Sequence, residues 1–246
     1  MSERTGCAAS AALAPLVDGP PRPLAVAHGS TTAWQLADES GRVVACLLSP
    51  RSLRLPHGIV VSSPLPDDGP APVSLGAGRL RIGDDDHRVA RWWRPAAPRH
   101  TDLYDSVDER AATVVLRSWR SRLGVGDGLT PYADDVLCGA LVTLLAAGHP
   151  AGAELADAVD GADLEAATTA TSAGLLRQAV HGRCIDALAG YLAARTSDAA
   201  ARDHRSLARL EEVGHSSGRG MAEGVHTVLP GAPPARRSSD TTVAAA

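Results

Sequence analysis

Residues 124–148 read GVGDGLTPYADDVLCGALVTLLAAG, and this stretch decides how the second half of the chain folds. Three alternating glycines precede Thr130, and Pro131 then introduces a long apolar run. Threonine is a favoured N-cap and proline is favoured in the first helical turn, so we expect a helix over residues 131–147. A membrane-spanning helix needs about 20 apolar residues. The run at 136–148 is shorter and predicts a helix buried in a protein core.

The glycine loop at 124–130 is a candidate anion site. Alternating glycines before a helix can turn backbone amides toward an anion, and the helix dipole adds to the attraction. From the pattern alone, a glycine-rich turn between two helices is equally well supported. Asp127, Asp134 and Asp135 would repel a bare phosphate unless Mg²⁺ or an arginine lies between them, or one aspartate accepts a proton. The helix dipole alone also stabilises carboxylates at this position.

The charged residues limit the chemistry of any site. The chain has 246 residues, and all 24 residues counted as lysine plus arginine are arginines. The absence of lysine excludes a Walker-type phosphate-binding lysine, a Schiff base and a lysine general base. Any fixed positive charge must come from arginine, a helix N-terminus or a metal. The formal net charge of −4 argues against nucleic acid as a partner.

The residue usage also indicates where the protein works. The chain has no lysine, asparagine or phenylalanine and is rich in alanine, glycine, arginine and proline, which indicates a GC-rich bacterial gene. The four cysteines are far apart in the sequence and form no CxxC pair, namely Cys7, Cys46, Cys138 and Cys184. This spacing predicts a reduced, cytoplasmic protein without a disulfide framework, and no segment predicts a membrane partner.

The first hundred residues have the character of strands. Apolar segments at 33–36 and 42–48 flank a turn at 38–41, and segments at 79–82 and 88–93 flank an aspartate-rich turn. Each pair predicts a hairpin. After Pro95 the apolar residues recur at helical spacing, as Ala111, Val115 and Trp119 show. We therefore predict an α+β fold, with an N-terminal antiparallel β-barrel or sandwich-like half followed by a C-terminal helical bundle.

The change from strand-like to helical spacing after Pro95 also predicts the domain organisation. We expect a flexible N-terminal segment at 1–20, a β-rich half at 21–98, a helical half at 99–230 and a disordered tail at 231–246. Besides the helix at 131–147, we expect helices at 151–159, 163–181, 183–194, 198–213 and 217–228. Several of them are followed by a glycine, which is a common residue just after a helix C-terminus.

Two further segments contain hydroxyl groups that could bind a ligand. Gly214-His-Ser-Ser-Gly218 formally fits the G-x-S-x-G motif of hydrolases, which requires a preceding strand. Because residues 206–213 are predicted to be helical, Ser216 or Ser217 is favoured as an N-cap, and this helix start is a second candidate anion site. In a continuous helix, Thr168 and Ser172 would share one face, where such hydroxyls usually bond back to a carbonyl.

Weaker signals lie in the β-rich half. Residues 84–87 read DDDH and resemble a metal-binding cluster, although a solvated turn is the favoured interpretation. His28 and the following Gly-Ser-Thr-Thr segment could line a pocket or serve structure alone. The metal that a site would use is not predicted by these patterns.

Three segments together resemble a known family. In chain order they are Gly124-x-Gly-x-Gly-Leu-Thr-Pro-x-x-Asp-Asp, Thr168-Thr-x-x-Ser172 and Gly214-His-Ser-Ser-Gly218. They are similar to the signatures of a bacterial domain-of-unknown-function family that includes the AllH-type subunit of oxamate carbamoyltransferase. The resemblance covers roughly residues 20–230, and its first signature is the most specific.

The resemblance implies a subunit of a carbamoyltransferase complex in purine and allantoin nitrogen catabolism. Such a complex interconverts oxalurate plus phosphate with oxamate plus carbamoyl phosphate. The implied partners are a small anionic substrate, phosphate or carbamoyl phosphate, and other carbamoyltransferase-like subunits. No cofactor is assigned from the sequence, and Mg²⁺ beside the aspartates of the glycine loop is the one candidate. Whether the chain is catalytic by itself is left open.

On this hypothesis Asp134 or Asp135 is the acid/base group. The ligand-binding residues would be Gly124, Gly126, Gly128, Thr130, Thr168, Ser172, His215, Ser216 and Ser217. The alternative hypothesis is a non-catalytic small-molecule-binding or scaffold subunit, in which the glycine loop only joins helices. A stand-alone serine hydrolase acting through Ser216 is a third hypothesis.

Overall fold

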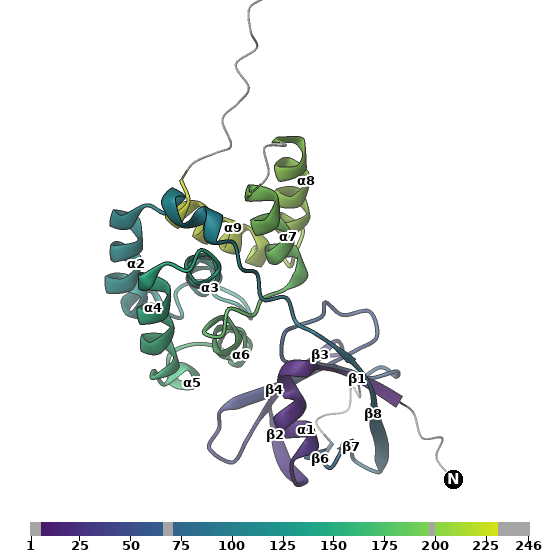
Figure 1. Cartoon of the computed structure of the whole chain (residues 1–246). Coiled ribbons are helices and arrows are strands. Elements are labelled where there is room, and N and C mark those ends of the chain that lie inside the picture. Colours follow the sequence, from purple (N-terminus) through teal and green to yellow (C-terminus); the bar gives the residue numbers. More distant parts are fainter. Residues whose placement is uncertain (1–5, 66–70, 197–199, 231–246) are drawn as a thin grey trace, which may run out of the picture.

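The computed structural model describes residues 6–65, 71–196 and 200–230, with a strand-rich N-terminal half and a helical C-terminal half (Figure 1). The tail predicted at 231–246 lies outside the described residues. A short 3-10 helix, η1 (Ala11–Leu13), and helix α1 (Ala14–Asp18) follow the first strand. The strands are β1 (Gly6–Ser10), β2 (Arg22–Gly29), β3 (Ala33–Ala37), β4 (Val43–Leu48), β5 (Gly58–Val60), β6 (Val73–Gly76), β7 (Arg79–Ile82) and β8 (Asp85–Trp93).

The strands form one closed barrel in the order β1-β5-β4-β3-β2-β6-β7-β8. Strand β1 pairs in parallel with β8, and β4 pairs in parallel with β5. The prediction of an antiparallel barrel or a sandwich-like half was therefore wrong, because the barrel is closed and mixed. Residues 6–10, expected within a flexible segment, form the strand that closes the barrel, and Ala9 is fully buried there.

Both predicted hairpins are confirmed. Strands β3 and β4 pair in antiparallel register with Gln35 opposite Cys46, and β7 and β8 pair with Arg81 opposite Asp86. In each hairpin the two strands are close in sequence, and the apolar segments and the turn between them can be recognised in the sequence. The parallel pairing of β4 with β5 is different, since the chain must return to the same end of the barrel before β5 can begin. The connection that makes this return, residues 49–57, becomes one wall of the site described below.

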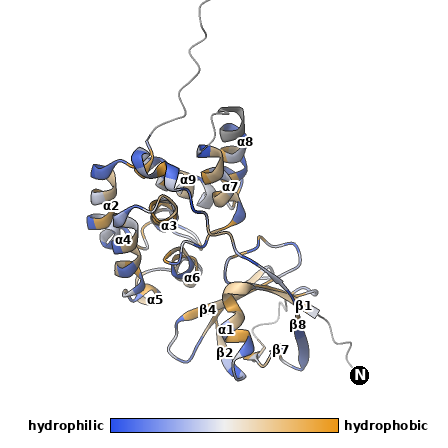
Figure 2. Ribbon diagram, in the orientation of Figure 1, coloured by the Kyte–Doolittle hydropathy of each residue, from blue (hydrophilic) through white to orange (hydrophobic). Residues whose placement is uncertain are grey.

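The helical half begins with a 3-10 helix, η2 (Thr101–Ser106), and is organised around one buried helix. Its helices are α2 (Glu109–Arg122), α3 (Tyr132–Ala146), α4 (Pro150–Asp160), α5 (Leu164–Ala167), α6 (Ala170–Ala179), α7 (Asp186–Arg195), α8 (Ala200–Glu211) and α9 (Ser217–Val228). Helix α3 contacts α2, α4, α6 and α9, and all but two of its 15 residues are buried. Figure 2 shows this contrast, with apolar colouring on α3 and hydrophilic residues on the outer helix α2.

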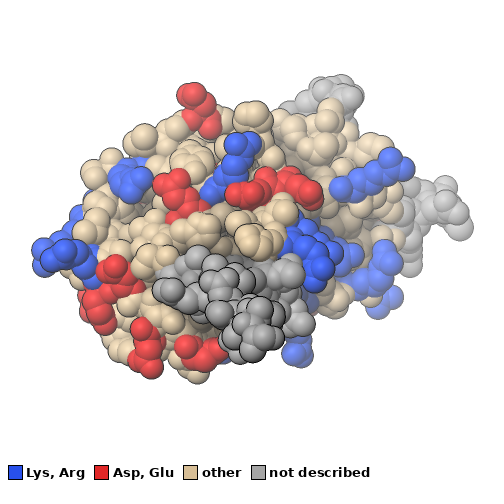
Figure 3. All heavy atoms as spheres, turned by 90° about the horizontal axis from the view of Figure 1, so that it is seen from above, with Lys and Arg blue, Asp and Glu red and all other residues tan. Residues whose placement is uncertain are grey.

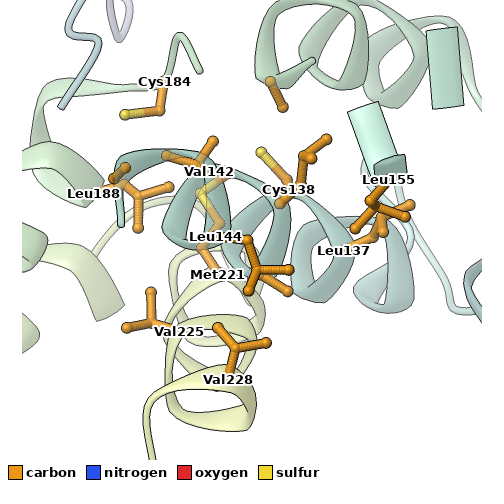
Figure 4. Packing of buried hydrophobic residues seen from close by; sticks show 14 of the residues in the cluster. Leu137, Cys138, Val142, Leu144, Leu155, Cys184, Leu188, Met221, Val225 and Val228 are labelled. Carbon is orange, nitrogen blue, oxygen red and sulfur yellow. The ribbon is translucent and has the colours of Figure 1, made fainter. Parts of the chain in front are cut away.

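Helices α3 and α9 pack unusually closely because glycines lie at their contact. A Cβ atom on Gly224 would lie 2.1 Å from the carbonyl oxygen of Val136, and one on Gly139 would lie 2.1 Å from that of Met221. Figure 4 shows the apolar side chains that fill the space around this contact, including Cys138, Met221 and Val225. The close approach brings the start of α9 beside the loop that precedes α3.

The helix predicted over 163–181 is two helices. Helix α5 ends at Ala167 and α6 begins at Ala170, so Thr168 and Ser172 do not share one helix. Thr169 is the N-cap of α6, and its hydroxyl accepts a hydrogen bond from the Ser172 amide at 3.2 Å. A capping hydroxyl offers the backbone an alternative to continued helix, which explains the break.

The two halves are joined by charged and hydrogen-bonded groups. The Glu165 carboxylate accepts a hydrogen bond from the Val43 amide of β4 at 2.9 Å and another from Arg177 Nε at 3.0 Å. Burial raises the pKa of Glu165, but its bonds to Arg177 and Val43 outweigh this effect, and the net pKa is lowered. The carboxylate is thus held in its charged form where the barrel meets α6.

Among the described helices, none has the length and hydropathy needed to cross a membrane. All four cysteines are free and buried. Figure 3, a view onto the helical end, shows both arginines and acidic side chains on that face.

Candidate functional site

A pocket of about 710 Å³ lies between the barrel and the helices. Its barrel wall combines the start of β3, the end of β4 and the 49–57 connection. Its helical wall combines the glycine loop, α6 and the loop before α9. The lining residues are Thr32, Ala33, Leu48, Ser49, Arg51, Ser52, Leu53, Leu55, Asp127, Gly128, Leu129, Thr130, Thr171, Gly214, His215, Ser216 and Ser217.

The 49–57 connection is fixed against the barrel by one carbonyl. The Thr32 carbonyl oxygen accepts hydrogen bonds from the Ser49 amide at 2.9 Å and from the Ser52 hydroxyl at 2.8 Å. The Ser49 and Ser52 hydroxyls are also bonded to each other at 2.8 Å. These bonds hold the turn that carries Arg51 at the pocket.

Backbone geometry explains why the loop before α3 needs its glycines. Gly124, Gly126 and Gly128 have φ values of 76°, 125° and 94°, which other residues rarely adopt. A Cβ on Gly124 would lie 2.4 Å from the Ala167 carbonyl oxygen, and one on Gly126 would lie 2.6 Å from the Tyr132 amide nitrogen. A Cβ on Gly128 would have no atom within 4 Å apart from those of its chain neighbours, so this glycine borders open space.

Asp134 fastens the glycine loop to the rest of the helical half. Its Oδ1 accepts a hydrogen bond from the Gly124 amide at 2.7 Å, and its Oδ2 accepts one from the Thr168 hydroxyl. The side chain is only 2% exposed and does not line the pocket. Asp134 and Thr168 therefore hold the loop in place, and the Gly124 amide is already occupied.

The amides at the pocket itself are free of protein partners. Within the described part of the chain, no protein atom accepts a hydrogen bond from the amides of residues 127–130. All four of these residues line the pocket. Backbone amides without an acceptor are costly when buried, and they are suited to bind an anion when they border a cavity.

The loops before α3 and α9 meet at a pair of hydroxyls. Thr130 Oγ1 lies 2.6 Å from Ser217 Oγ, and both residues line the pocket. The prediction that Thr130 caps α3 was wrong, since α3 begins at Tyr132 with Pro131 as its N-cap. The Thr130 hydroxyl is bonded instead to a residue 87 positions away.

Asp135 lies behind this pair of hydroxyls. Its side chain is 2% exposed, and its Oδ2 is buried without a hydrogen-bond partner among the described residues. Burial raises the pKa of Asp135 to about 7, helped by the negative charge of Asp134 and opposed by the Thr130 and Ser217 hydroxyls. Asp135 therefore changes its charge near neutral pH.

The 214–218 loop joins two helices, α8 and α9. The nucleophile elbow of hydrolases has a strand at the position of α8, so the serine-hydrolase hypothesis lacks its structural context. Gly214, with a φ of 62°, turns the chain, and Ser216 is the N-cap of α9. His215 is exposed and lines the pocket together with Ser216.

The structure brings together five of the nine predicted ligand-binding residues in the pocket lining: Gly128, Thr130, His215, Ser216 and Ser217. Gly124, Gly126, Thr168 and Ser172 lie outside it. Ser172 is buried and its hydroxyl has no partner in the described structure, whereas its neighbour Thr171 lines the pocket.

The segment from His28 to Thr32 was expected as a possible pocket lining, and Thr32 does line the pocket, but sequence reasoning missed the rest of the barrel wall, including its one arginine, Arg51. No sequence pattern near Arg51 predicts its position. It lies in the connection between β4 and β5, and the parallel pairing of these strands places that connection at the pocket. The DDDH segment also forms no metal centre. In the described residues no three His, Cys, Asp or Glu side chains are grouped as metal ligands, and Arg51 is the one arginine among the residues that line the pocket.

Comparison with known proteins finds a match within the helical half of the chain. No curated protein and no solved structure matches the chain. The barrel, including Arg51, lies outside the region that the matching family model covers. That region, residues 122–229, begins at the end of α2 and holds the glycine loop, Asp134 and the 214–218 loop. Residues 122–229 match the family model of the oxamate carbamoyltransferase subunit AllH, which confirms over this region the resemblance predicted from the sequence.

Proposed function

We propose that the pocket binds phosphate, or the phosphate group of carbamoyl phosphate, as part of an oxamate carbamoyltransferase-like complex. The observation that carries this proposal is the set of four partner-free amides at 127–130 in a pocket that Arg51 also lines. Backbone amides and an arginine guanidinium both donate hydrogen bonds to anions, and the guanidinium also supplies a fixed positive charge in a chain without lysine. The family named by residues 122–229 supports carbamoyl transfer as the reaction.

Asp135 supplies the acid/base group in this proposal. When phosphate attacks the carbamoyl carbon of oxalurate, the carbon–nitrogen bond breaks and the departing nitrogen of oxamate takes up a proton. An aspartate with a pKa of about 7 can hold a proton and release it at neutral pH. The hydroxyls of Thr130 and Ser217 lie at the pocket, and they are the groups through which Asp135 acts.

Calorimetry with inorganic phosphate tests the anion site. We expect phosphate to bind to the full chain and to bind about tenfold or more weakly to Arg51→Gln, because a hydrogen bond to a charged group contributes about 1.5–3 kcal/mol. The matched control is Arg117→Gln, which removes an exposed arginine of α2 outside the pocket and should leave the affinity unchanged.

Two results would contradict the proposal. If phosphate and carbamoyl phosphate do not bind to the chain, alone or with its partner subunits, the pocket is not an anion site. If Arg51→Gln and Arg117→Gln bind phosphate equally well, Arg51 is not the cation that serves it.

One observation favours a second candidate, a non-catalytic binding subunit. Asp135 does not line the pocket, so it does not border a ligand directly. Replacing Asp135 with asparagine separates the two candidates. Loss of carbamoyl transfer by the assembled complex, with phosphate affinity retained and the melting temperature not lowered, supports an acid/base role. Unchanged transfer supports the binding subunit.

A further inference from the structure

We infer that this pocket has an apolar subsite beside its anion site, so that it binds an organic anion carrying an apolar group of several carbon atoms more tightly than phosphate or carbamoyl phosphate. This inference rests on the proposed anion site and names the class of molecule that the site accepts. It follows from the size of the pocket and from the leucines on its two walls.

The pocket is too large for phosphate or carbamoyl phosphate alone. Its volume is about 710 Å³, within the range of roughly 300–1,000 Å³ that holds drug-sized ligands. Carbamoyl phosphate has eight non-hydrogen atoms. At no more than about 30 Å³ for each water-sized group, it would fill about a third of this space. The remaining volume is available to a larger molecule.

The remaining volume is bordered by apolar side chains. Leu48, Leu53 and Leu55 belong to the barrel wall, and Leu129 belongs to the glycine loop on the helical wall. Leu53 is 46% exposed and Leu129 is 53% exposed, so both retain apolar surface that a ligand can cover. A single exposed leucine is ordinary, but two on opposite walls of one pocket form an apolar binding surface.

The polar groups are placed beside this apolar surface. Leu129 follows Gly128 directly, and Leu53 lies two residues after Arg51. An anionic group at the amides of residues 127–130 would therefore lie next to the leucines. Ligand pockets commonly combine an apolar lining with a few polar groups that fix the orientation, and this pocket follows that pattern.

A series of alkyl phosphates tests the inference by calorimetry on the full chain. Each buried methylene group strengthens binding about fourfold, so butyl phosphate should bind at least tenfold more tightly than methyl phosphate. The variant Leu53→Ser should lose most of this advantage and keep the affinity for methyl phosphate. The control Val114→Ser changes a residue of α2 that is 56% exposed and lies outside the pocket, and it should retain the advantage.

The outcomes separate this inference from the proposed function. If methyl phosphate binds and butyl phosphate binds no more tightly, the apolar subsite is refuted and the anion site remains. If neither compound binds, both are refuted. If Leu53→Ser and Leu129→Ser, each with an unchanged melting temperature, keep the full advantage of butyl phosphate, the alkyl chain does not contact this pocket and the inference is wrong.

Discussion

Replacement of Asp135 with asparagine should stabilise the protein at neutral and alkaline pH. Burial raises the pKa of this carboxyl group from its usual 3.8 to about 7. The folded state therefore binds the proton more tightly than the unfolded state does. Between pH 3.8 and pH 7 the unfolded chain has released this proton and the folded chain has kept it, so the contribution of Asp135 to stability becomes less favourable as the pH rises.

The size of the effect follows from this difference in pKa. At 1.36 kcal/mol for each pH unit of difference in pKa, Asp135 lowers the free energy of unfolding by about 4 kcal/mol above pH 7. Asparagine resembles the protonated carboxyl group and does not ionise. We expect Asp135→Asn to exceed the wild type by about 2–4 kcal/mol in free energy of unfolding at pH 8, and by little at pH 4.5.

Urea unfolding from pH 4.5 to pH 8 measures this difference directly. The control is Asp157→Asn, which changes an exposed aspartate of α4 and should give the same small difference at every pH. The reasoning is refuted if the difference between Asp135→Asn and the wild type does not change with pH. In that case Asp135 is either solvated or paired with a charge that stabilises its ionised form.

Further predictions concern the packing and the bonds that position the site. Gly224→Ala should lower the free energy of unfolding by about 2–3 kcal/mol, because its Cβ would lie 2.1 Å from a carbonyl oxygen. The control is Gly190→Ala in α7, where the new Cβ meets no atom within 4 Å, and it should raise the free energy of unfolding by up to about 1 kcal/mol. If urea unfolding gives the same change for Gly224→Ala and Gly190→Ala, the close contact between α3 and α9 is contradicted. Asp134→Asn should cost about 2 kcal/mol by the same measurement, since the bond from Thr168 is weakened, and an unchanged stability would show that the glycine loop does not depend on it. Glu165→Gln should cost about 2 kcal/mol at pH 7 and less as the pH falls through the lowered pKa of Glu165, and a loss independent of pH would contradict the ion pair with Arg177.

The parts of the fold that are local in sequence could be predicted. The two hairpins and the buried helix α3 follow from alternation, turn residues and a long apolar run, all of which lie within short windows. The closure of the barrel could not be predicted this way. Strand β1 pairs with β8, about eighty residues later, and nothing within residues 6–10 indicates that partner.

The site shows the same division. The glycine loop was visible because positive φ values at alternate positions demand glycine, and the 214–218 loop was visible as a helix start. Arg51 was not visible, because its position depends on the parallel pairing of β4 with β5. Thr130 was assigned to a local cap, whereas a long-range contact with Ser217 uses its hydroxyl. Local chemistry indicates which groups are available, and the tertiary contacts decide what each one binds.

Phosphate titration followed by amide NMR tests the central claim, that the loop before α3 binds an anion through its backbone. We expect the amide resonances of residues 127–130 to shift and to saturate together as phosphate is added. The amides of Gly41 and Gly78 serve as controls, because these glycines also have positive φ values but donate to the carbonyls of Asp38 and Val17. Saturating shifts at 127–130 with unchanged control amides would support the account. If the resonances of residues 127–130 do not shift, or shift no more than those of Gly41 and Gly78, the account is wrong.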